Sequence, residues 1–129
     1  MIKFKDRYFT ASDSRGSIEG LIDFGPWHEI NYITSRSDIK RGNHYHKKTL
    51  EAFFIISGKI MISLQQISNN KLKGKIETHI VSKGQFFIIS PYTFHVFEVI
   101  ENAEWLNFLS LKMTKKAPDI HRIMKKNDD

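Results

Sequence analysis

The chain has 129 residues, the size of one domain that can bury its own core. It has no cysteine, which excludes disulfides, thiolate metal sites and a cysteine nucleophile. Its formal net charge of +6 suits anionic ligands such as phosphorylated small molecules, while no aromatic-interleaved basic strand favours nucleic acid.

At the N-terminus, residues 1–10 lack the apolar core of a signal peptide, and no later apolar run is long enough to cross a membrane. We therefore expect a cytoplasmic protein with neither a membrane nor a nucleic acid as partner. One domain is expected over residues 1–124, followed by a frayed polar tail over residues 125–129.

Runs of apolar and β-branched residues predict strands through the middle of the chain. Residues 52–56 and 85–89 are continuous runs, whereas residues 59–67 and 105–111 alternate, and the lysine-rich residues 68–75 are interpreted as a loop. Turn signals separate the runs at residues 57–59, 69–70, 83–84, 91–92 and 101–102. Short strands at this spacing, without a long amphipathic helix, predict an all-β sandwich or barrel.

The strongest chemical signal is the pair His44 and His46. Residues i and i+2 of a strand point to the same side, so the two imidazoles converge. Glu51 returns to that side if residues 47–50 form a bulge or turn, and His95 joins if the strand 93–100 lies beside His44. Three imidazoles and a carboxylate suit zinc, nickel, manganese or iron. Without a metal, the same histidines would be cavity residues held by hydrogen bonds.

The chain resembles the cupin superfamily in the order of its motif residues. That order is His44, His46, Glu51, Gly58, Gly84, Pro91 and His95. The chain departs from the family pattern because only Asn43 separates Gly42 from His44, and no glycine follows Pro91. The resemblance implies a single-domain jelly-roll barrel that forms a homodimer through its N-terminal strands.

A narrower resemblance involves residues 41–47, Arg-Gly-x-His-x-His-Lys, and residues 13–16, Asp-x-Arg-Gly. Both stretches resemble nucleotide-sugar cupins: the dTDP-4-keto-6-deoxyglucose 3,4-ketoisomerases, the WxcM-like proteins and the C-terminal cupin of capsule-sugar reductases. This implies an isomerase or epimerase that acts next to the keto group of a dTDP- or UDP-linked 4-keto-6-deoxy sugar, in surface-polysaccharide biosynthesis. The ketoisomerases generally carry glutamine at the position of Glu51 and work without metal, so Glu51 favours the metal-binding, epimerase-like branch.

Two mechanisms compete for the same residues. A neutral imidazole can accept and return a carbon-bound proton, so His44 or His46 is a candidate base. If a metal is held by His44, His46, Glu51 and His95, it polarises the carbonyl, and the base is then another group. Tyr32, the counterpart of the family's catalytic tyrosine, and His28 are the candidates for that base.

Arg41, Lys40 and Arg15 are candidates for binding the pyrophosphate, since a guanidinium offers a planar fork of donors. An ion pair between Arg41 and Asp38 is the alternative for that arginine. The alternative to an enzyme is a non-catalytic metal- or ligand-binding module that acts as a sensor or accessory partner. Turnover of a nucleotide-linked 4-keto sugar distinguishes the two.

Overall fold

Nine β-strands make up the fold in the computed structural model, which describes residues 1–116 and 118–123. Those residues include no helix, and hence none that could cross a membrane, and the expected all-β class is confirmed. The expected tail, residues 125–129, lies outside the described residues. The strands are β1 (Ile2–Lys5), β2 (Phe9–Asp13), β3 (Gly16–Gly20), β4 (Glu29–Ser35), β5 (Lys40–His44), β6 (Glu51–Ser68), β7 (Lys71–Ser82), β8 (Phe86–Ile89) and β9 (Thr93–Leu109).

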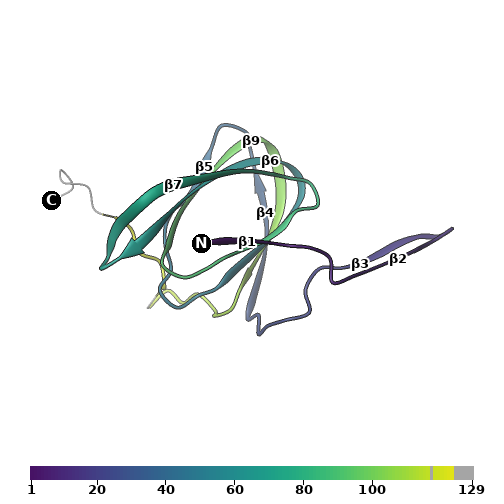
Figure 1. Ribbon diagram of the computed structural model, residues 1–129, viewed down its shortest axis with the longest axis horizontal. Helices are drawn as coiled ribbons and strands as arrows, with labels where there is room; N and C mark the ends of the chain where they lie inside the picture. Colours follow the sequence, from purple (N-terminus) through teal and green to yellow (C-terminus); the bar gives the residue numbers. More distant parts are fainter. Residues whose placement is uncertain (117, 124–129) are drawn as a thin grey trace.

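The long antiparallel strands β6 and β9 form the central pair of the barrel (Figure 1). They pair along nearly their whole length, from Glu51 opposite Leu109 to Gln66 opposite Thr93. β8 and β4 flank one half of this pair, and β7 and β5 flank the other half. With β1, which pairs with β8 at one edge, these strands make a seven-stranded sheet that curls around a common core.

Two of the expected turns, at residues 57–59 and 101–102, are wrong, because both stretches lie inside long strands. The register between β6 and β9 shifts around Gly58, where φ is +92°. A Cβ at Gly58 would lie only 2.3 Å from the carbonyl oxygen of Asn102. Glycine and asparagine therefore serve here as a bulged corner at which the paired strands bend together, and the chain does not reverse.

The loop expected over residues 68–75 is also wrong beyond its first residues. Asn69 and Asn70, with φ of 52° and 62°, form a two-residue turn, and β7 begins at Lys71. Paired left-handed residues are typical of a tight hairpin between twisted strands. Among the described strands, β7 pairs only with β6, so its lysines lie on an exposed edge strand, where charge opposes edge-to-edge association.

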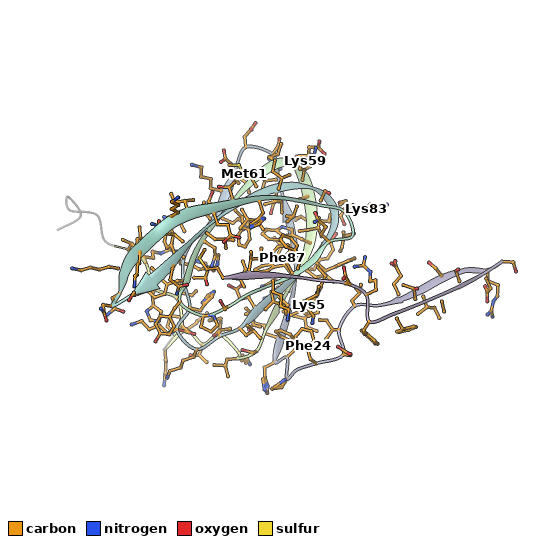
Figure 2. The ribbon with its side chains drawn as sticks, viewed as in Figure 1. Lys5, Phe24, Lys59, Met61, Lys83 and Phe87 are labelled. Atoms are coloured by element: carbon orange, nitrogen blue, oxygen red, sulfur yellow. The ribbon has the colours of Figure 1, made fainter. Side chains whose placement is uncertain are left out.

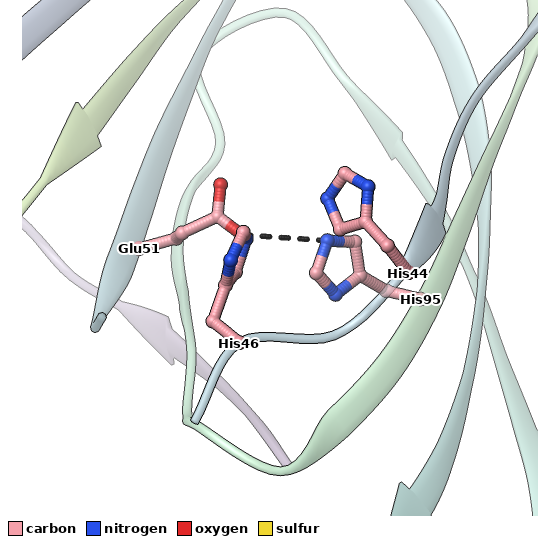
Figure 3. A group of neighbouring side chains, drawn as sticks. All are labelled: His44, His46, Glu51 and His95. Atoms are coloured by element: carbon pink, nitrogen blue, oxygen red, sulfur yellow. Dashed lines mark ion pairs between the residues drawn. The ribbon is translucent and has the colours of Figure 1, made fainter. Parts of the chain in front are cut away.

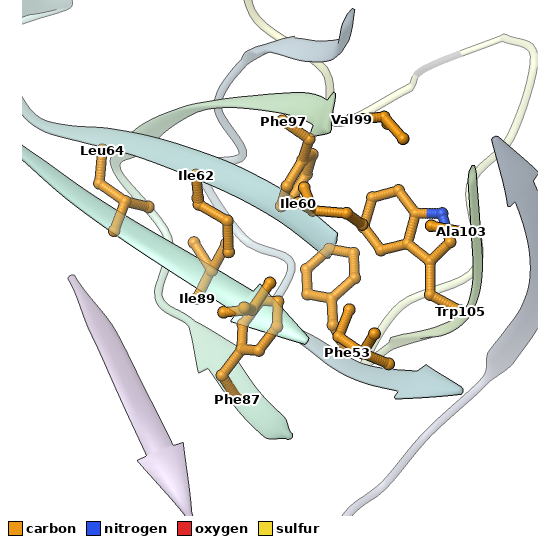
Figure 4. Packing of buried hydrophobic residues seen from close by; sticks show 12 residues of the cluster. Phe53, Ile60, Ile62, Leu64, Phe87, Ile89, Phe97, Val99, Ala103 and Trp105 are labelled. Carbon is orange, nitrogen blue, oxygen red and sulfur yellow. The ribbon is translucent and has the colours of Figure 1, made fainter. Parts of the chain in front are cut away.

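The main core lies inside the curled sheet (Figure 4). Phe53, Phe87, Phe97 and Trp105 pack there against the isoleucines and the leucine of β6. Each large side chain removed from water contributes roughly 1.5–3 kcal/mol to stability. Trp105 Nε1 donates to Ser35 Oγ at 3.1 Å, so its polar atom is satisfied. Phe53 and Trp105 are thus core residues.

The hairpin of β2 and β3 forms a separate two-stranded sheet that extends away from the barrel (Figures 1 and 2). Its residues are exposed along both strands, except Gly20 at the base. Phe9 and Ile18 expose 43% and 65% of their surface. Arg7 ties its base to the barrel, since it donates to Glu19 of β3 at 3.1 Å and to the Gly84 carbonyl at 2.6 Å.

Candidate active site

A bulge in β5 turns His44 toward the interior. Arg41 pairs with the buried Phe97 and Gly42 pairs with Val96, but the next paired residue is His44, opposite His95. The extra residue is Asn43, with φ of +60°, and Gly42 has φ of +86°. A Cβ at Gly42 would meet the His95 carbonyl oxygen at 2.9 Å. The glycine thus permits the close approach, and the inserted residue gives His44 the inward orientation.

His46 and Glu51 reach the same place from either end of a short loop. β5 ends at His44, so His46 lies beyond the strand, and a bend at residues 47–48 leads to Glu51, the first residue of β6. His95 comes from β9, the strand paired with β5. The expected neighbourhood of His44 and His95 is confirmed, and the loop supplies the turn that the return of Glu51 requires.

The four side chains form one buried cluster (Figure 3). Each offers one ligand atom, and these atoms all lie within 4.8 Å of one another. Glu51 Oε1 lies 2.6 Å from His46 Nε2 and 3.3 Å from His95 Nε2. The ring centroid of His44 lies 4.9 Å from that of His46 and 4.8 Å from that of His95. The residues that the sequence indicated as metal ligands are thus brought together.

Hydrogen bonds on the far side of the cluster orient three of its members. His46 Nδ1 donates to the carbonyl oxygen of Asp119, and His95 Nδ1 donates to the carbonyl of Thr93 at 3.0 Å. Because a carbonyl only accepts, each ring carries its proton on Nδ1 and presents the lone pair of Nε2 to the cluster. Asn107 Nδ2 donates to Glu51 Oε2 at 3.0 Å, which leaves Oε1 free.

The inner atoms, by contrast, have no hydrogen-bond partner within the described chain. These atoms are His44 Nδ1, His46 Nε2, Glu51 Oε1 and His95 Nε2. The contact of 2.6 Å between Glu51 and His46 is close, but the two groups are not aligned for a hydrogen bond. Buried lone pairs without donors are costly unless a cation or a proton satisfies them. Three nitrogens and one carboxylate oxygen, each with an outer partner except His44, fit a divalent metal ion.

The buried environment separates the pKa values of the cluster. Burial, followed by the neighbouring His95 and His46, lowers the pKa of His44 to about 4. Burial also opposes the charged form of His46, but the Glu51 carboxylate and the Asp119 carbonyl outweigh it and raise its pKa. Burial alone would raise the pKa of Glu51, yet His46 and His95 hold it below its usual value. His44 is therefore neutral near neutral pH, while Glu51 is ionised.

A hollow of about 640 Å³ opens beside His44. Its wall includes three cationic residues, Lys40, Arg41 and Arg122, together with Val96 and the backbone of Gly42 and Asn43. His44 belongs both to this wall and to the cluster, so a ligand in the hollow reaches the cluster through His44. A second hollow, of about 530 Å³, is lined by Arg36 and Glu104 and does not include any cluster residue.

The candidates for binding the pyrophosphate lie in two different parts of the molecule. Lys40 and Arg41 line the hollow, but the Arg41 side chain donates to Ser35 Oγ and the Thr34 carbonyl, at 2.8 and 3.1 Å, and not to Asp38. Arg15 lies at the tip of the hairpin, where it pairs with Asp13 at 2.6 Å.

Tyr32 is not brought to the cluster. It is 59% exposed and its hydroxyl bonds to Glu104. Its neighbour Asn31 donates to Asn107, which contacts Glu51, at 3.4 Å. Adjacent residues of a strand point to opposite faces, so β4 directs Asn31 inward and Tyr32 outward. His28, the other alternative base, is exposed just before β4.

Sequence reasoning missed Asn107, Asp119 and Arg122, all of which contact the site. Asn107 carries no motif, and its role follows only from the pairing of β9 with β6. Residues 119 and 122 lie in a polar C-terminal region that resembles a solvated tail. The bridge between Tyr45 and His121 brings that region to the cluster, and no local pattern signals such a long-range contact.

Solved structures with the same fold include enzymes that act on nucleotide sugars. WlaRB, a TDP-quinovose 3,4-ketoisomerase from Campylobacter jejuni, has a TM-score of 0.76 and 19% identity, with 94% of this chain and 92% of that chain covered. The dTDP-4-dehydrorhamnose 3,5-epimerase from Sulfolobus tokodaii has a TM-score of 0.70 and 17% identity, with 89% and 78% covered. Likeness at this level of identity shows the fold, a cupin-type barrel, as the motif order implied.

A third similar structure is CapF, a capsular polysaccharide assembling protein from Staphylococcus aureus, with a TM-score of 0.68 and 21% identity. The alignment covers 91% of this chain but 34% of CapF, so the chain spans about a third of that protein's length. No curated protein sequence gives a significant match. The family model described as the polysaccharide biosynthesis C-terminal domain matches residues 11–116. The chain therefore belongs to the polysaccharide biosynthesis C-terminal domain family.

Proposed function

We propose that the chain is a cytoplasmic sugar-nucleotide isomerase or epimerase of surface-polysaccharide biosynthesis. Its substrate is a dTDP- or UDP-linked 4-keto-6-deoxy sugar, and the reaction takes place next to the keto group. The observation that carries the proposal is the position of His44, in the wall of a cationic hollow and in the buried cluster at once. The solved ketoisomerases and the epimerase with this fold support the substrate class.

The chemistry requires a base beside the sugar ketone. The carbon–hydrogen bond next to the carbonyl breaks, its electron pair forms an enediolate, and the proton passes to the imidazole of His44. Return of that proton to the neighbouring carbon moves the keto group, and return to the other face inverts the carbon. His44 is neutral at neutral pH, and its Nδ1 has no hydrogen-bond partner among the described residues. A positioned base typically contributes about 10²–10⁴-fold to the rate.

The cluster also fits a divalent cation, for which zinc, nickel, manganese and iron are the candidates. His44, His46, Glu51 and His95 would hold it, and it would supply Lewis-acid polarisation of the carbonyl. In that case His44 is a ligand and its basicity is lost, so the two mechanisms exclude each other at this residue. Glu51 and the outer bonds to His46 and His95 position the imidazoles in either mechanism.

The cationic wall suits the pyrophosphate of the substrate. Arg122 donates through Nη1 to the carbonyl oxygens of Gly42 and Asn43, at 3.3 and 3.1 Å, which holds its guanidinium at the hollow beside His44. Lys40 adds a second positive charge on the same wall. Arg41 supports that wall through its bonds to β4. A guanidinium offers paired donors that match a phosphate.

A homodimer gives the hairpin of β2 and β3 a partner. The exposed Phe9 and Ile18 side chains would be covered by a second copy, and Arg15 at the tip would reach that copy's pyrophosphate site. Light scattering is expected to show a dimer at micromolar concentration. Ile18→Asp is expected to shift it to monomer, and a wild-type monomer would contradict this arrangement.

Solvent exchange tests the reaction itself. A nucleotide-linked 4-keto-6-deoxy sugar is incubated with the protein in D₂O, and deuterium at the carbon beside the ketone is followed by NMR. His44→Asn and His46→Asn are each expected to slow the exchange by about 10²–10⁴-fold. His79→Asn, a partly buried histidine on β7 outside the cluster, is the matched control.

Chelation then separates the two mechanisms. Exchange that survives metal removal identifies histidine base catalysis, and exchange that stops identifies Lewis-acid assistance. Absence of exchange with every such sugar, in protein that still binds the nucleotide, would contradict the proposed enzyme and indicate a binding module.

A further inference from the structure

Residues 118–123 lie across the segment that carries the two motif histidines. His121 and Tyr45 exchange backbone hydrogen bonds, each of 2.9 Å, in an isolated antiparallel bridge. We call residues 118–123 the C-terminal strap. It begins more than 60 residues after the histidine motif, yet the bridge fixes its register against Tyr45, between the two histidines.

Asp119 joins the strap to the loop before Glu51 through hydrogen bonds. Its Oδ1 accepts from the backbone N–H of Lys47 at 2.9 Å. Its Oδ2 accepts from the backbone N–H groups of Lys48 and Thr49, both at 2.8 Å, and from the Thr49 hydroxyl at 2.9 Å. The carboxylate, whose side chain is only 15% exposed, thus satisfies three successive donors of a chain bend. A charged acceptor makes such bonds roughly twice as strong as neutral ones.

The backbone of the same residue touches the cluster. The Asp119 carbonyl oxygen accepts from His46 Nδ1, so Asp119 holds the loop through its side chain and the histidine ring through its main chain. This bond keeps the His46 proton on Nδ1, and it turns the Nε2 lone pair toward Glu51. Two attachments at one residue allow little relative movement between the ring and the loop.

We propose that Asp119 is a positioning residue of the active site, which acts by locking the tautomer and the orientation of His46. This inference rests on the proposed function only for its effect on catalysis. The tautomer and the orientation of His46 can be measured without substrate or metal. Asp119 does not touch the reacting atoms. Its role is to keep the His46 Nε2 lone pair directed at the cluster, as hydrogen bonds behind metal-binding histidines do.

A merely structural role for Asp119 is distinguishable, because the strap contributes nothing to the main core. The buried cluster of that core comes from β6, β7, β8 and β9. Loss of the Asp119 carboxylate should therefore loosen the strap and the loop while the barrel still folds.

The test compares Asp119→Ala and Asp119→Asn with Glu77→Gln. Asp119 Oδ1 lies 3.0 Å from Nε2 of His121, two residues away. Glu77 is a suitable control because it likewise contacts a histidine two residues away, His79, at 2.7 Å, but on an exposed strand. In metal-free protein at alkaline pH, two-bond ¹H–¹⁵N spectra report which ring nitrogen of His46 carries the proton. Competition with a chelating indicator reports the affinity for Zn²⁺ and Co²⁺.

Asp119→Ala is expected to convert the single Nδ1-protonated form of His46 to a mixture and to lower metal affinity by about 10–100-fold. Asp119→Asn, which keeps one acceptor oxygen, should give an intermediate shift, and Glu77→Gln none. An unchanged His46 tautomer in Asp119→Ala would overturn the inference. If wild-type protein binds neither ion, the proposed metal role fails, and the tautomer still decides the role of Asp119.

Thr49→Val keeps the test decisive if Asp119→Ala does not fold. This substitution removes one bond of 2.9 Å to Asp119 Oδ2 and leaves the others. A smaller change of the His46 tautomer in the same direction supports the inference, and no change contradicts it.

Discussion

Two contacts between a carboxylate and a basic side chain have the same separation but lie in opposite environments of this protein. Glu51 and His46 meet at 2.6 Å in the cluster, and Asp13 and Arg15 meet at 2.6 Å at the tip of the hairpin. The side chains are 7% and 5% exposed in the first pair, and 51% and 89% exposed in the second. Distance alone therefore does not distinguish a site from a surface contact.

The difference lies in what surrounds each pair. In the cluster, water is excluded, so charge and burial shift the pKa values of His44, His46 and Glu51 in different directions. At the hairpin tip, the bond from Arg15 lowers the pKa of Asp13, but water screens the pair and leaves it little energetic weight. Each prediction below tests this contrast.

Glu51→Gln should have the largest effect, a loss of Zn²⁺ affinity of more than about 100-fold. The reason is that it removes the only anionic ligand, whereas residues behind the ligands typically account for 10–100-fold. Chelator competition measures it, and Asp13→Asn is expected to leave the affinity unchanged. Equal affinities in Glu51→Gln and wild type would show that the ion, if bound, lies elsewhere.

The stability of metal-free protein should fall between pH 6.5 and pH 4 because of His44. Unfolded His44 has the ordinary pKa of 6.5, whereas the native residue has a pKa of about 4, so the unfolded state binds more protons in this window. The free energy of unfolding then decreases by up to about 3 kcal/mol as the pH falls. Urea denaturation across this range measures the decrease.

His44→Asn should flatten part of this decrease. His95, whose pKa burial also lowers, contributes in the same direction and remains in the variant. His46, with its raised pKa, is fully stabilising below pH 6.5 and loses that contribution only as the pH rises through its native pKa, so it does not change the window. A variant with the full wild-type decrease would exclude His44 as its source.

Arg122→Gln should lower the affinity for a nucleoside diphosphate by about 10-fold, because a charged hydrogen bond contributes roughly 1.5–3 kcal/mol. Arg15→Gln should have a smaller effect, and only in dimeric protein, since Arg15 lies away from the hollow of its own chain. Isothermal titration calorimetry measures both. Equal losses of affinity in the two variants, measured in monomeric protein, would contradict the distinction between the hollow and the hairpin.

Asp13→Asn should produce the smallest effect, with no measurable change in the thermal midpoint of monomeric protein. Water replaces the lost contact at the exposed tip. Differential scanning calorimetry of Asp13→Asn beside wild type measures it. A clear decrease would mean that the hairpin tip is covered.

The local sequence pattern was sufficient to identify the residues of the buried cluster. The spacing of His44, His46 and Glu51 predicted their convergence, and His95 followed from the expected pairing of its strand with that of His44. Pattern failed at residues 57–59 and 101–102, where turn-forming residues lie in bent strands, because the choice between a turn and a corner depends on the strand opposite.

By itself, the sequence determined the all-β class, the identity of the cluster residues and the positive wall at Lys40 and Arg41, since strand parity and side-chain chemistry are local properties. Only the tertiary structure decided that Tyr32 points outward, that Arg15 lies on a separate hairpin, and that Asp119 and Arg122 join the site. These placements depend on contacts between segments far apart in the chain. Buried hydrogen-bond donors require acceptors, and no pattern within one segment specifies which distant segment supplies those acceptors.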